Sequence, residues 1–430
     1  MPVKSPGDSS MNIPVLGAAR LPSPLKHWVD ESERVPETIL RTVDARPEDG
    51  LFFELAGARE HLFFNPPDTR AGIVTCGGLC PGLNDVIRSL FLELHHAYGV
   101  KEVLGFRWGY QGLDPEHGVE PLILTPELVD GIHLQGGTIL GTSRGPVDKA
   151  RAVENLIRRR VNILFAIGGD GTQRGALALF EEAQRRGYML SVVGIPKTID
   201  NDVSFVARSF GFLTAVHEAA TVLQRAHTEA RSVQNGIALV KLMGRHAGFL
   251  TAEATVASQD VNFTLIPEVP FRLDGECGFL SSLERRIMNR GHAVIAVAEG
   301  AGQELLGNAG KERDASGNIK LSDIGLFLHK QIGEWFQARK IPVVMRYFDP
   351  SYLVRSSPDN AEDTILCDAF ARHAAHAAMA GKTGLVIGYL HDRFIHVPIT
   401  LLASQQKRLD PDGPAWSAVL SATGQPHHFQ

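Results

Sequence analysis

The chain has 430 residues, of which 44% are hydrophobic and 21% charged, and its formal net charge is −5. This length predicts two or three domains with a sizeable buried core, and the composition is that of an ordinary globular protein and not of a disordered one. The slight acidity argues against nucleic acid as a partner, because such proteins carry broad basic surfaces. An anionic substrate would therefore be met by a few placed Lys and Arg side chains.

The sequence carries no sign of secretion or of a membrane span. Four cysteines do not make a disulfide scaffold in a chain of this length. Residues 1–70 contain no apolar signal-peptide core, and no run of about 18 apolar residues occurs. We therefore expect a cytoplasmic protein with reduced thiols. The first 25 or so residues, rich in Pro and Ser, predict a loosely held arm.

From residue 71 onward, short runs of Val, Ile, Leu and Ala alternate with helical stretches. Residues 71–76 predict a buried strand, and a Gly/Pro turn and a helix over 85–98 follow it. The alternation recurs with strands over 162–167, 191–195, 236–242 and 292–298, and with a helix over 172–186. Such runs are typical of parallel strands covered by helices on both faces. We therefore predict an α/β fold with two Rossmann-like, doubly wound lobes and largely parallel sheets.

Three glycine-rich loops follow predicted strands, at the sheet edge where open α/β proteins bind ligands. They span residues 76–84, 136–145 and 167–175. Glycine lets the backbone approach a polyphosphate closely, and the following helix adds the positive end of its dipole. None is a Walker A loop, because Leu83 and Asn84 stand where that motif needs Lys and Ser/Thr. The first loop alone could also be a simple turn.

One carboxylate, that of Asp170, lies inside the third glycine-rich loop. A carboxylate beside phosphate-binding amides can hold Mg²⁺ against the oxygens of a nucleotide. The structural alternative is that Asp170 caps the amino end of a helix.

A second acidic motif, residues 196–202, follows a predicted strand and places Asp200 and Asp202 close to Lys197 and Thr198. In phosphoryl transfer to an alcohol, one carboxylate can accept the hydroxyl proton while Lys and Mg²⁺ offset the charge on the moving group. The spacing fits Asp200 as the base and Asp202 as a second polar anchor. An Asx-rich turn is the structural alternative.

Further charged side chains follow later strands, in residues 243–245, 299–302 and 346–355. The arginine fork suits a sugar phosphate, and a carboxylate suits sugar hydroxyls. Individually, each of these charges could also belong to a surface salt bridge.

Together, these strings resemble the phosphofructokinase family, and the likeness runs from about Phe53 to about Thr383. Five motifs occur in that family in this order: residues 76–84, 168–172, 196–202, 243–245 and 349–355. The resemblance implies a glycolytic kinase that phosphorylates the 1-hydroxyl of fructose 6-phosphate, with Asp200 as general base.

The resemblance also implies a role for each candidate residue. Asp170 would be the Mg²⁺ contact, and Lys197 and Thr198 would join Asp200 as catalytic groups. The phosphoryl donor would be bound by Gly77, Arg144, Gly169, Asp170, Gly171, Thr172 and Gly175. Fructose 6-phosphate would be held by Thr198, Asp200, Asp202, Met243, Gly244, Arg245, Glu299, Arg346, Tyr352 and Arg355. Some phosphate contacts in such enzymes come from a neighbouring subunit, so a homo-oligomer, dimer or tetramer, is implied.

On this basis we expect four segments along the chain. Residues 1–70 would form an amino-terminal extension and 71–210 a lobe that binds the phosphoryl donor. Residues 211–385 would form a lobe that binds the sugar phosphate, and 386–430 a carboxyl-terminal segment, of which the tail from about residue 402 carries no legible role.

Two positions bear on the phosphoryl donor. Family members that use pyrophosphate typically carry Asp where Gly171 stands, filling the space of a nucleotide's α-phosphate, together with a lysine like Lys197. ATP enzymes of the bacterial type have glycine at both places. The combination found here is that of the plant- and protist-like ATP branch. We therefore favour ATP, with pyrophosphate as the alternative donor.

The acceptor site departs from the short bacterial enzymes as well. Asn235 and Gly236 stand where those enzymes have an arginine, so the phosphate of the substrate must find other cations, with Arg346 and Arg355 as candidates. A related acceptor, such as sedoheptulose 7-phosphate, remains an alternative.

Two other classes of protein fit less well. Residues 141–145 match the G-x-S-x-G pattern of serine hydrolases, but Pro146 follows at once and no suitable downstream His stands out. A non-catalytic, ligand-sensing homologue would keep the phosphate loops and lose the base, whereas Asp170, Asp200 and Arg245 are all present.

Overall fold

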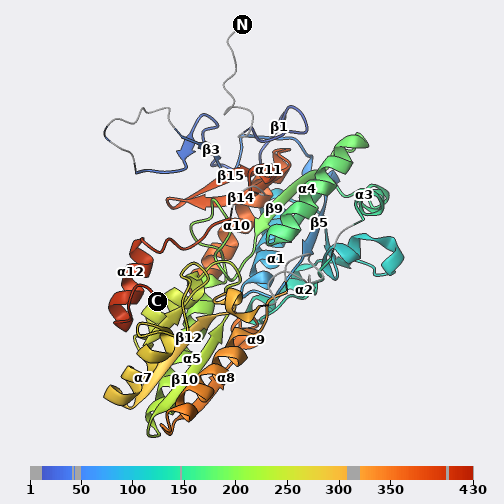
Figure 1. Ribbon diagram of the computed structural model, residues 1–430. Coiled ribbons are helices and arrows are strands. Elements are labelled where there is room, and N and C mark those ends of the chain that lie inside the picture. The colour runs from blue at the N-terminus through green and yellow to red at the C-terminus, as the bar shows by residue number, and fades with distance from the viewer. Residues whose placement is uncertain are drawn as a thin grey trace. The chain divides into compact units, whose positions relative to one another are not determined.

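The computed structural model describes residues 12–40, 43, 50–145, 148–307, 320–402 and 406–429 (Figure 1). The chain divides into two compact units, each assembled from separate segments of the sequence. The first unit runs to Thr198 and adds Val203–Gly211 and Pro358–Gln406. The second consists of Ile199–Asp202, Phe212–Ser357 and the chain from Lys407 onward. Every helix among the described residues is too short or too polar to cross a lipid bilayer.

A mixed sheet forms the centre of the first unit. Its strands are β2 (Arg34–Pro36), β3 (Phe52–Leu55), β5 (Arg70–Thr75), β6 (Glu102–Phe106), β7 (Leu122–Ile123), β8 (Ile163–Gly168), β9 (Ser191–Pro196), β14 (Leu385–Leu390) and β15 (Arg393–Pro398). Among the described residues their order is β2-β3-β15-β14-β9-β8-β5-β6-β7. The five strands from β14 to β6 are parallel, and the strands at both edges pair antiparallel. A separate ribbon pairs β1 (Leu21–Pro22) with β4 (His61–Leu62).

Helices cover the sheet of the first unit. They are α1 (Leu83–Leu92), continued by η2 (Glu93–Tyr98), α2 (Pro126–Val129), α3 (Lys149–Arg158), α4 (Asp170–Arg185), α10 (Ala361–Met379) and α11 (Ile399–Leu402). Short 3-10 turns are η1 (Pro66–Asp68), η3 (Gly109–Leu113), η4 (Pro115–His117) and η5 (Ile132–Leu134). Helix α1 packs against α10, and α3 against α4, while α4 and α10 both contact β9. The central strands are fully buried runs of apolar residues, as parallel strands between helix layers require.

The second unit contains a smaller, parallel sheet. Its strands are β10 (Gly236–Leu242), β11 (Phe263–Leu265), β12 (His292–Ala298) and β13 (Val344–Phe348), in the order β11-β12-β10-β13. Its helices are α5 (Phe212–Arg231), α6 (Phe249–Ser258), α7 (Phe279–Arg290), η6 (Gln303–Leu306), α8 (Ile324–Ala338), α9 (Ser351–Val354) and α12 (Pro414–Thr423). Two units with largely parallel sheets and helices between the strands confirm the predicted α/β, doubly wound fold.

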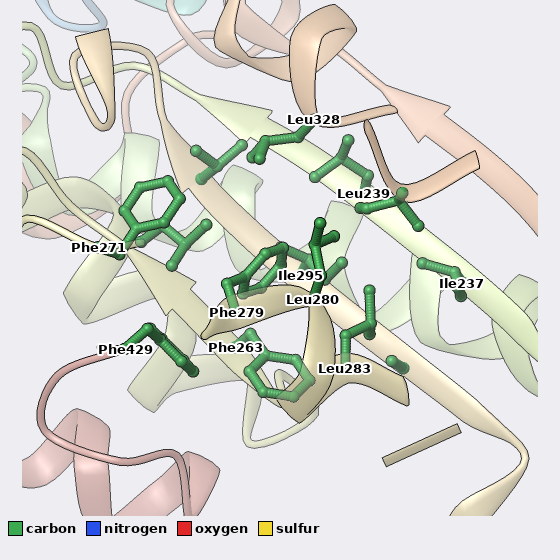
Figure 2. Packing of buried hydrophobic residues seen from close by; sticks show 14 of the residues in the cluster. Ile237, Leu239, Phe263, Phe271, Phe279, Leu280, Leu283, Ile295, Leu328 and Phe429 are labelled. Atoms are coloured by element: carbon green, nitrogen blue, oxygen red, sulfur yellow. The ribbon is translucent and has the colours of Figure 1, made fainter. Parts of the chain in front are cut away.

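An aromatic cluster forms one side of the core of the second unit (Figure 2). Phe263 of β11 and Phe279 of α7 meet edge to face, with ring centroids 5.6 Å apart. Phe429, the next-to-last residue of the sequence, lies 5.6 Å from Phe279 and 6.0 Å from Phe263. Each buried aromatic ring removes a large apolar area from water. The carboxyl-terminal segment is therefore part of this core.

The expectation of a loosely held amino-terminal arm is wrong for the described residues from Pro14 to Leu21. Leu16 N donates to Gly381 O at 2.9 Å, Thr383 N donates to Pro14 O at 3.0 Å, and Leu21 pairs with Leu62. The Pro-rich composition suggested disorder, but these residues satisfy their backbone groups against distant parts of the chain.

The two units also differ from the predicted ranges. Helix α10 and strand β14, expected in the lobe 211–385, belong to the first unit, where α10 packs on α1 and β14 pairs with β9. Strands β2 and β3, expected in an extension, form an edge of its sheet. The predicted segment 386–430 is shared between the units, with the break at Gln406. The chain therefore returns to the first unit after completing most of the second.

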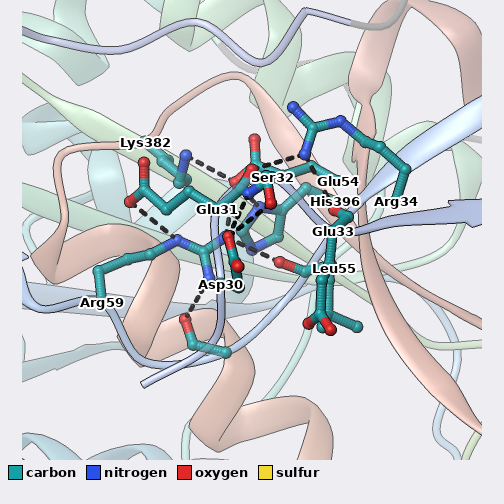
Figure 3. Close-up of polar contacts among 11 residues, drawn as sticks. Asp30, Glu31, Ser32, Glu33, Arg34, Glu54, Leu55, Arg59, Lys382 and His396 are labelled. Carbon is teal, nitrogen blue, oxygen red and sulfur yellow. Dashed lines mark hydrogen bonds and ion pairs between the residues drawn. The ribbon is translucent and has the colours of Figure 1, made fainter.

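A largely buried carboxylate, that of Glu54, connects β3 to β15 in the sheet of the first unit (Figure 3). Oε1 of Glu54 on β3 accepts hydrogen bonds from Arg59 Nη2 at 2.6 Å and from His396 Nδ1 at 3.2 Å, and lies 2.7 Å from Lys382 Nζ. Burial alone would raise the pKa of Glu54, but His396 and Lys382 outweigh that effect and hold the pKa below its ordinary value.

A second buried acid, Asp85, joins α1 to the residues before α10. Burial, a hydrogen bond to Asp359 and the charge of Asp359 raise the pKa of Asp85 to about 8. At pH values between the ordinary pKa of an Asp carboxyl and about 8, Asp85 is protonated in the folded chain and deprotonated in the unfolded chain. The free energy of unfolding should therefore fall as the pH rises through this window.

We expect Asp85→Asn to remove much of this dependence, because an amide needs no proton to face Asp359. Relative to the parent, the variant should gain about 1–3 kcal/mol of stability between pH 5.5 and 8.5. Urea unfolding at several pH values measures this, with Asp368→Asn, at a half-exposed position on α10, as the control. Equal pH slopes for the parent and Asp85→Asn would contradict the shared-proton account.

Candidate active site

The three glycine-rich loops, far apart in sequence, lie side by side in the first unit. Cys76 N donates to Ile167 O at 2.9 Å, which joins the first loop to the third. Gly77 N donates to Ser143 O at 3.0 Å, and Thr142 Oγ1 donates to Gly77 O at 2.6 Å, which joins the first loop to the second. Neighbouring parallel strands carry the first and third loops, so their carboxyl ends meet at one edge of the sheet.

The third loop leads directly into α4. Gly168 ends β8, Gly169 occupies the N-cap position and Asp170 is the first helical residue. The alternative that Asp170 is the helix cap is therefore wrong. A Cβ on Gly168 would lie 2.1 Å from Thr172 Oγ1, so the tight turn requires glycine. The amino end of α4, with the positive end of its dipole, suits the binding of a phosphate.

Two further glycines of α4 have different surroundings. A Cβ on Gly171 would have only one neighbour within 4 Å, Arg174 Nη2 at 3.8 Å, so this position opens onto space. A Cβ on Gly175 would lie 2.4 Å from the ring of Tyr110, whose hydroxyl donates to Thr172 O at 2.5 Å. Glycine at position 175 therefore allows α4 to approach Tyr110 closely.

Lys197 lies between the first and third loops. Its backbone N donates to Gly168 O at 3.2 Å, and its Nζ donates to Gly78 O at 2.6 Å. The side chain is only 6% exposed, which fixes a positive charge among the phosphate-binding loops. Thr198 follows with its carbonyl held by Ser209 Oγ at 2.8 Å, and Arg144 is exposed in the second loop.

In the second unit, acids gather around Asp200. Its Oδ2 accepts a hydrogen bond from Arg245 N at 3.4 Å. Burial raises the pKa of Asp200 well above its ordinary value, and the carboxylates of Asp202 and Glu299 raise it further. A carboxyl group with such a pKa is a candidate acid or base for proton transfer.

The loops after β10 and β12 meet beside these acids. Glu299 N donates to Leu242 O at 2.9 Å, and Gly300 N donates to Gly244 O at 3.0 Å. A Cβ on Gly300 would lie 1.9 Å from Arg245 O, so the close approach of the loops needs glycine at this position. Burial raises the pKa of Glu299, although the charge of Arg245 opposes it. The loop of Met243, Gly244 and Arg245 is thus joined to Glu299.

The remaining predicted side chains do not form one group. The guanidinium of Arg355 stacks over the ring of Tyr352, 4.5 Å from its centroid, and Tyr352 is 72% exposed. Arg346 lies in the middle of β13, opposite Ala238 of β10, and its Nε is 3.9 Å from a carboxylate oxygen of Glu229. The structure therefore does not bring Arg346 to the strand ends where Arg245 and Glu299 meet.

Sequence reasoning missed Lys241. Its Nζ lies 2.7 Å from Asp323 Oδ2 and 2.8 Å from Asp349 Oδ2, immediately before the Met243 loop. A single lysine in the otherwise apolar strand β10 was the signal for such a network, because a half-buried amine requires acidic partners.

The carboxyl-terminal tail was missed as well. Lys407 N donates to Asp202 O at 3.2 Å. The carboxylate of Glu268 accepts from Gly248 N at 3.0 Å and from Leu409 N at 2.9 Å. Residues expected to carry no legible role therefore hold the acidic segment and the start of α6. The tail makes these contacts through the backbone N–H groups of Lys407 and Leu409, which leave no residue-type signal in a sequence.

One unit carries glycine-rich loops at strand ends, and the other carries an acid–arginine cluster at strand ends. Together these features define a class of protein, the two-unit α/β phosphotransferases. A family model described as "Phosphofructokinase" matches residues 70–378. The chain belongs to the phosphofructokinase family, and the resemblance found in its motifs is confirmed.

Curated relatives resemble the chain along nearly its whole length. It is 47% identical to "ATP-dependent 6-phosphofructokinase" of Borreliella burgdorferi over 93% of this chain and 91% of that one. It is 44% identical to "ATP-dependent 6-phosphofructokinase" of Amycolatopsis methanolica, over 97% and 95%. The solved pyrophosphate-dependent phosphofructokinase of Marinobacter aquaeolei is similar in fold, with a TM-score of 0.68 over 83% of this chain and 91% of that one, at 21% identity.

Proposed function

We propose that the chain is an ATP-dependent 6-phosphofructokinase, which transfers the γ-phosphoryl group of ATP to the 1-hydroxyl of fructose 6-phosphate. The observation that carries the choice of donor is the open space at Gly171, where no side chain blocks a nucleotide's α-phosphate. The names of the relatives, at 44% and 47% identity, support the same donor. Pyrophosphate is the second candidate, because Lys197 accompanies the pyrophosphate-using members.

We assign donor binding to the first unit. The amino end of α4 and the joined glycine loops offer N–H groups to the phosphates, and Lys197 adds a fixed positive charge. The proposed donor contacts are Gly77, Arg144, Gly169, Asp170, Gly171, Thr172 and Gly175. Asp170 fits Mg²⁺, because a carboxylate in the first turn of α4 is the hard oxygen ligand that this ion prefers. When bound, Mg²⁺ neutralises charge on the phosphates.

We assign acceptor binding and proton transfer to the second unit, with Thr198 contributing from the end of the first. Asp200 accepts the proton of the 1-hydroxyl, and the backbone N of Arg245 holds its Oδ2. Lys197 precedes Asp200 by three residues, so the cation and the base are linked by a short stretch of chain. The proposed acceptor contacts are Thr198, Asp200, Asp202, Met243, Gly244, Arg245, Glu299, Arg346, Tyr352 and Arg355.

A homo-oligomer would explain the position of Arg346, which lies in the middle of β13 with Glu229 at 3.9 Å. In a dimer or tetramer, such an arginine can serve the sugar phosphate bound by a neighbouring copy. Tyr352 and Leu353, 72% and 73% exposed, offer apolar area next to the predicted acceptor residues. We therefore include a second copy of the chain among the proposed partners.

The proposed reaction is tested by the initial rate of fructose 1,6-bisphosphate formation with purified chain, Mg²⁺ and fructose 6-phosphate. ATP and pyrophosphate are compared as donors at equal concentrations. We expect a strong preference for ATP. Faster turnover with pyrophosphate would overturn the assignment of the donor, and no product with either donor would overturn the assignment of the reaction.

A further inference from the structure

Two histidines of the second unit face each other outside the proposed active site. His227 lies near the carboxyl end of α5, and His292 is the first residue of β12. Their Nε2 atoms are 3.3 Å apart. Their Nδ1 atoms point to oxygens: His227 Nδ1 lies 2.7 Å from Asp260 Oδ1, and His292 Nδ1 lies 3.1 Å from Arg290 O.

These oxygens determine where the ring protons are. A carboxylate and a backbone carbonyl can only accept hydrogen bonds, so both Nδ1 atoms must carry hydrogen. The Nε2 atom of each neutral ring is then a bare acceptor. Two lone pairs that face each other at 3.3 Å repel, unless a proton or a metal ion lies between them. The arrangement therefore requires an electrophilic occupant.

The spacing favours a metal ion. Two imidazole nitrogens bound to Zn²⁺ at about 2.0–2.1 Å in a tetrahedral arrangement lie about 3.3 Å apart, which is the distance observed here. Metal-bound histidines almost always donate their other N–H to a carboxylate or a backbone carbonyl. His227 and His292 make one contact of each kind.

We propose that His227 and His292 form a site for Zn²⁺ or a similar imidazole-binding divalent ion, with Asp260 and Arg290 O as the supports of the two rings. Water would fill the remaining positions, because no group of three or more metal-binding side chains occurs among the described residues. Two protein ligands make the site weaker than a closed structural zinc site, which has four.

The charges around the pair are of both signs. Arg286 and Arg231 lie near His292 and oppose a divalent ion. Arg286 Nε, however, donates to His292 O at 3.2 Å, and Asp260 supplies a negative charge beside His227.

The site is separate from the proposed chemistry. His292 begins β12, whereas Glu299 follows the other end of that strand, about 20 Å away at the usual rise per residue. An ion bound here would join the end of α5 to the start of β12. Because the unfolded chain lacks this geometry, the ion should stabilise the folded protein.

Zinc titration of the full chain, stripped with a chelator and kept in excess Mg²⁺, tests the proposal. All proteins carry His427→Gln and His428→Gln, because these adjacent tail histidines, 2.9 Å apart, could bind zinc themselves. This background protein should bind one Zn²⁺ more tightly than any other and melt at a higher temperature with zinc. His292→Gln and His227→Gln should each lose that binding event and the melting shift.

Asp260→Asn is the variant that isolates the support of the ring, and we expect it to weaken zinc binding about 10–100-fold. Turnover without zinc should match the background in all variants, which shows that they are folded. If His292→Gln or His227→Gln keeps the zinc stoichiometry and the melting shift, the site is wrong. If the background protein binds no zinc in this way, the pair shares a proton and the proposal fails.

Discussion

Replacing Asp200 with Asn is expected to lower kcat about 10²–10⁴-fold, because a general base is lost while the size of the side chain is kept. The KM for fructose 6-phosphate should stay within a few-fold of the parent value, since an amide still offers polar contacts to the sugar. Steady-state kinetics at saturating ATP and Mg²⁺ measures both quantities. Turnover within a few-fold of the parent would rule out Asp200 as the base.

Asp202→Asn is the matched control, because it makes the same chemical change two residues away. We expect a smaller loss of kcat, because Asp202 is proposed to contact the sugar phosphate and not to accept the proton. The parent should also show an acidic limb in kcat/KM above the ordinary range of an Asp carboxyl, because burial, Asp202 and Glu299 raise the pKa of Asp200. Activity rises with pH through that limb as the base loses its proton.

Replacing Gly171 with Asp is expected to lower kcat/KM for ATP about 10²-fold or more, since placing like charges together costs several kcal/mol. The position is open, so the fold should accept the side chain, and the new carboxylate would occupy the space proposed for the α-phosphate. Pyrophosphate, which has no α-phosphate, should lose much less. The ratio of kcat/KM for the two donors is the measurement.

Gly171→Ala separates the charge from the added bulk. Its methyl group would meet only Arg174 Nη2, at 3.8 Å, so ATP kinetics should stay close to the parent. An equal loss with Ala and with Asp would show that backbone freedom at residue 171 matters rather than donor discrimination. An unchanged donor ratio in Gly171→Asp would place the α-phosphate elsewhere.

Local patterns predicted the centre of each unit well. The strands over 236–242 and 292–298 match β10 and β12 in both bounds. The first and third glycine loops lie at strand ends as expected, whereas the second follows the 3-10 turn η5 and no strand. Buried parallel strands are continuous apolar runs that turn residues interrupt, so their bounds can be predicted from the local sequence alone. Loops that need glycine for close approach, as at Gly168, are equally local.

Long-range pairing could not be predicted in the same way. Strand β14 pairs with β9 almost two hundred residues earlier in the chain, and Leu16 bonds to Gly381; no periodicity encodes either partner. Arg346 is a related case. Its residue type suits a sugar phosphate, but its place in mid-strand follows from the register with β10, which the sequence does not show. Residue types therefore predict the members of the candidate site better than they predict where those members lie.

The place of Phe429 in the core of the second unit has a consequence for biosynthesis. Phe429 leaves the ribosome long after Phe263 and Phe279, the rings against which it packs, and the first unit likewise needs α10, β14 and β15, which follow most of the second unit in the chain. Neither unit can therefore finish folding when its first segments have been made, unlike domains that fold one after another from the amino terminus. Partly synthesised chains therefore expose an incomplete sheet edge. In this state, chaperones would protect them from aggregation.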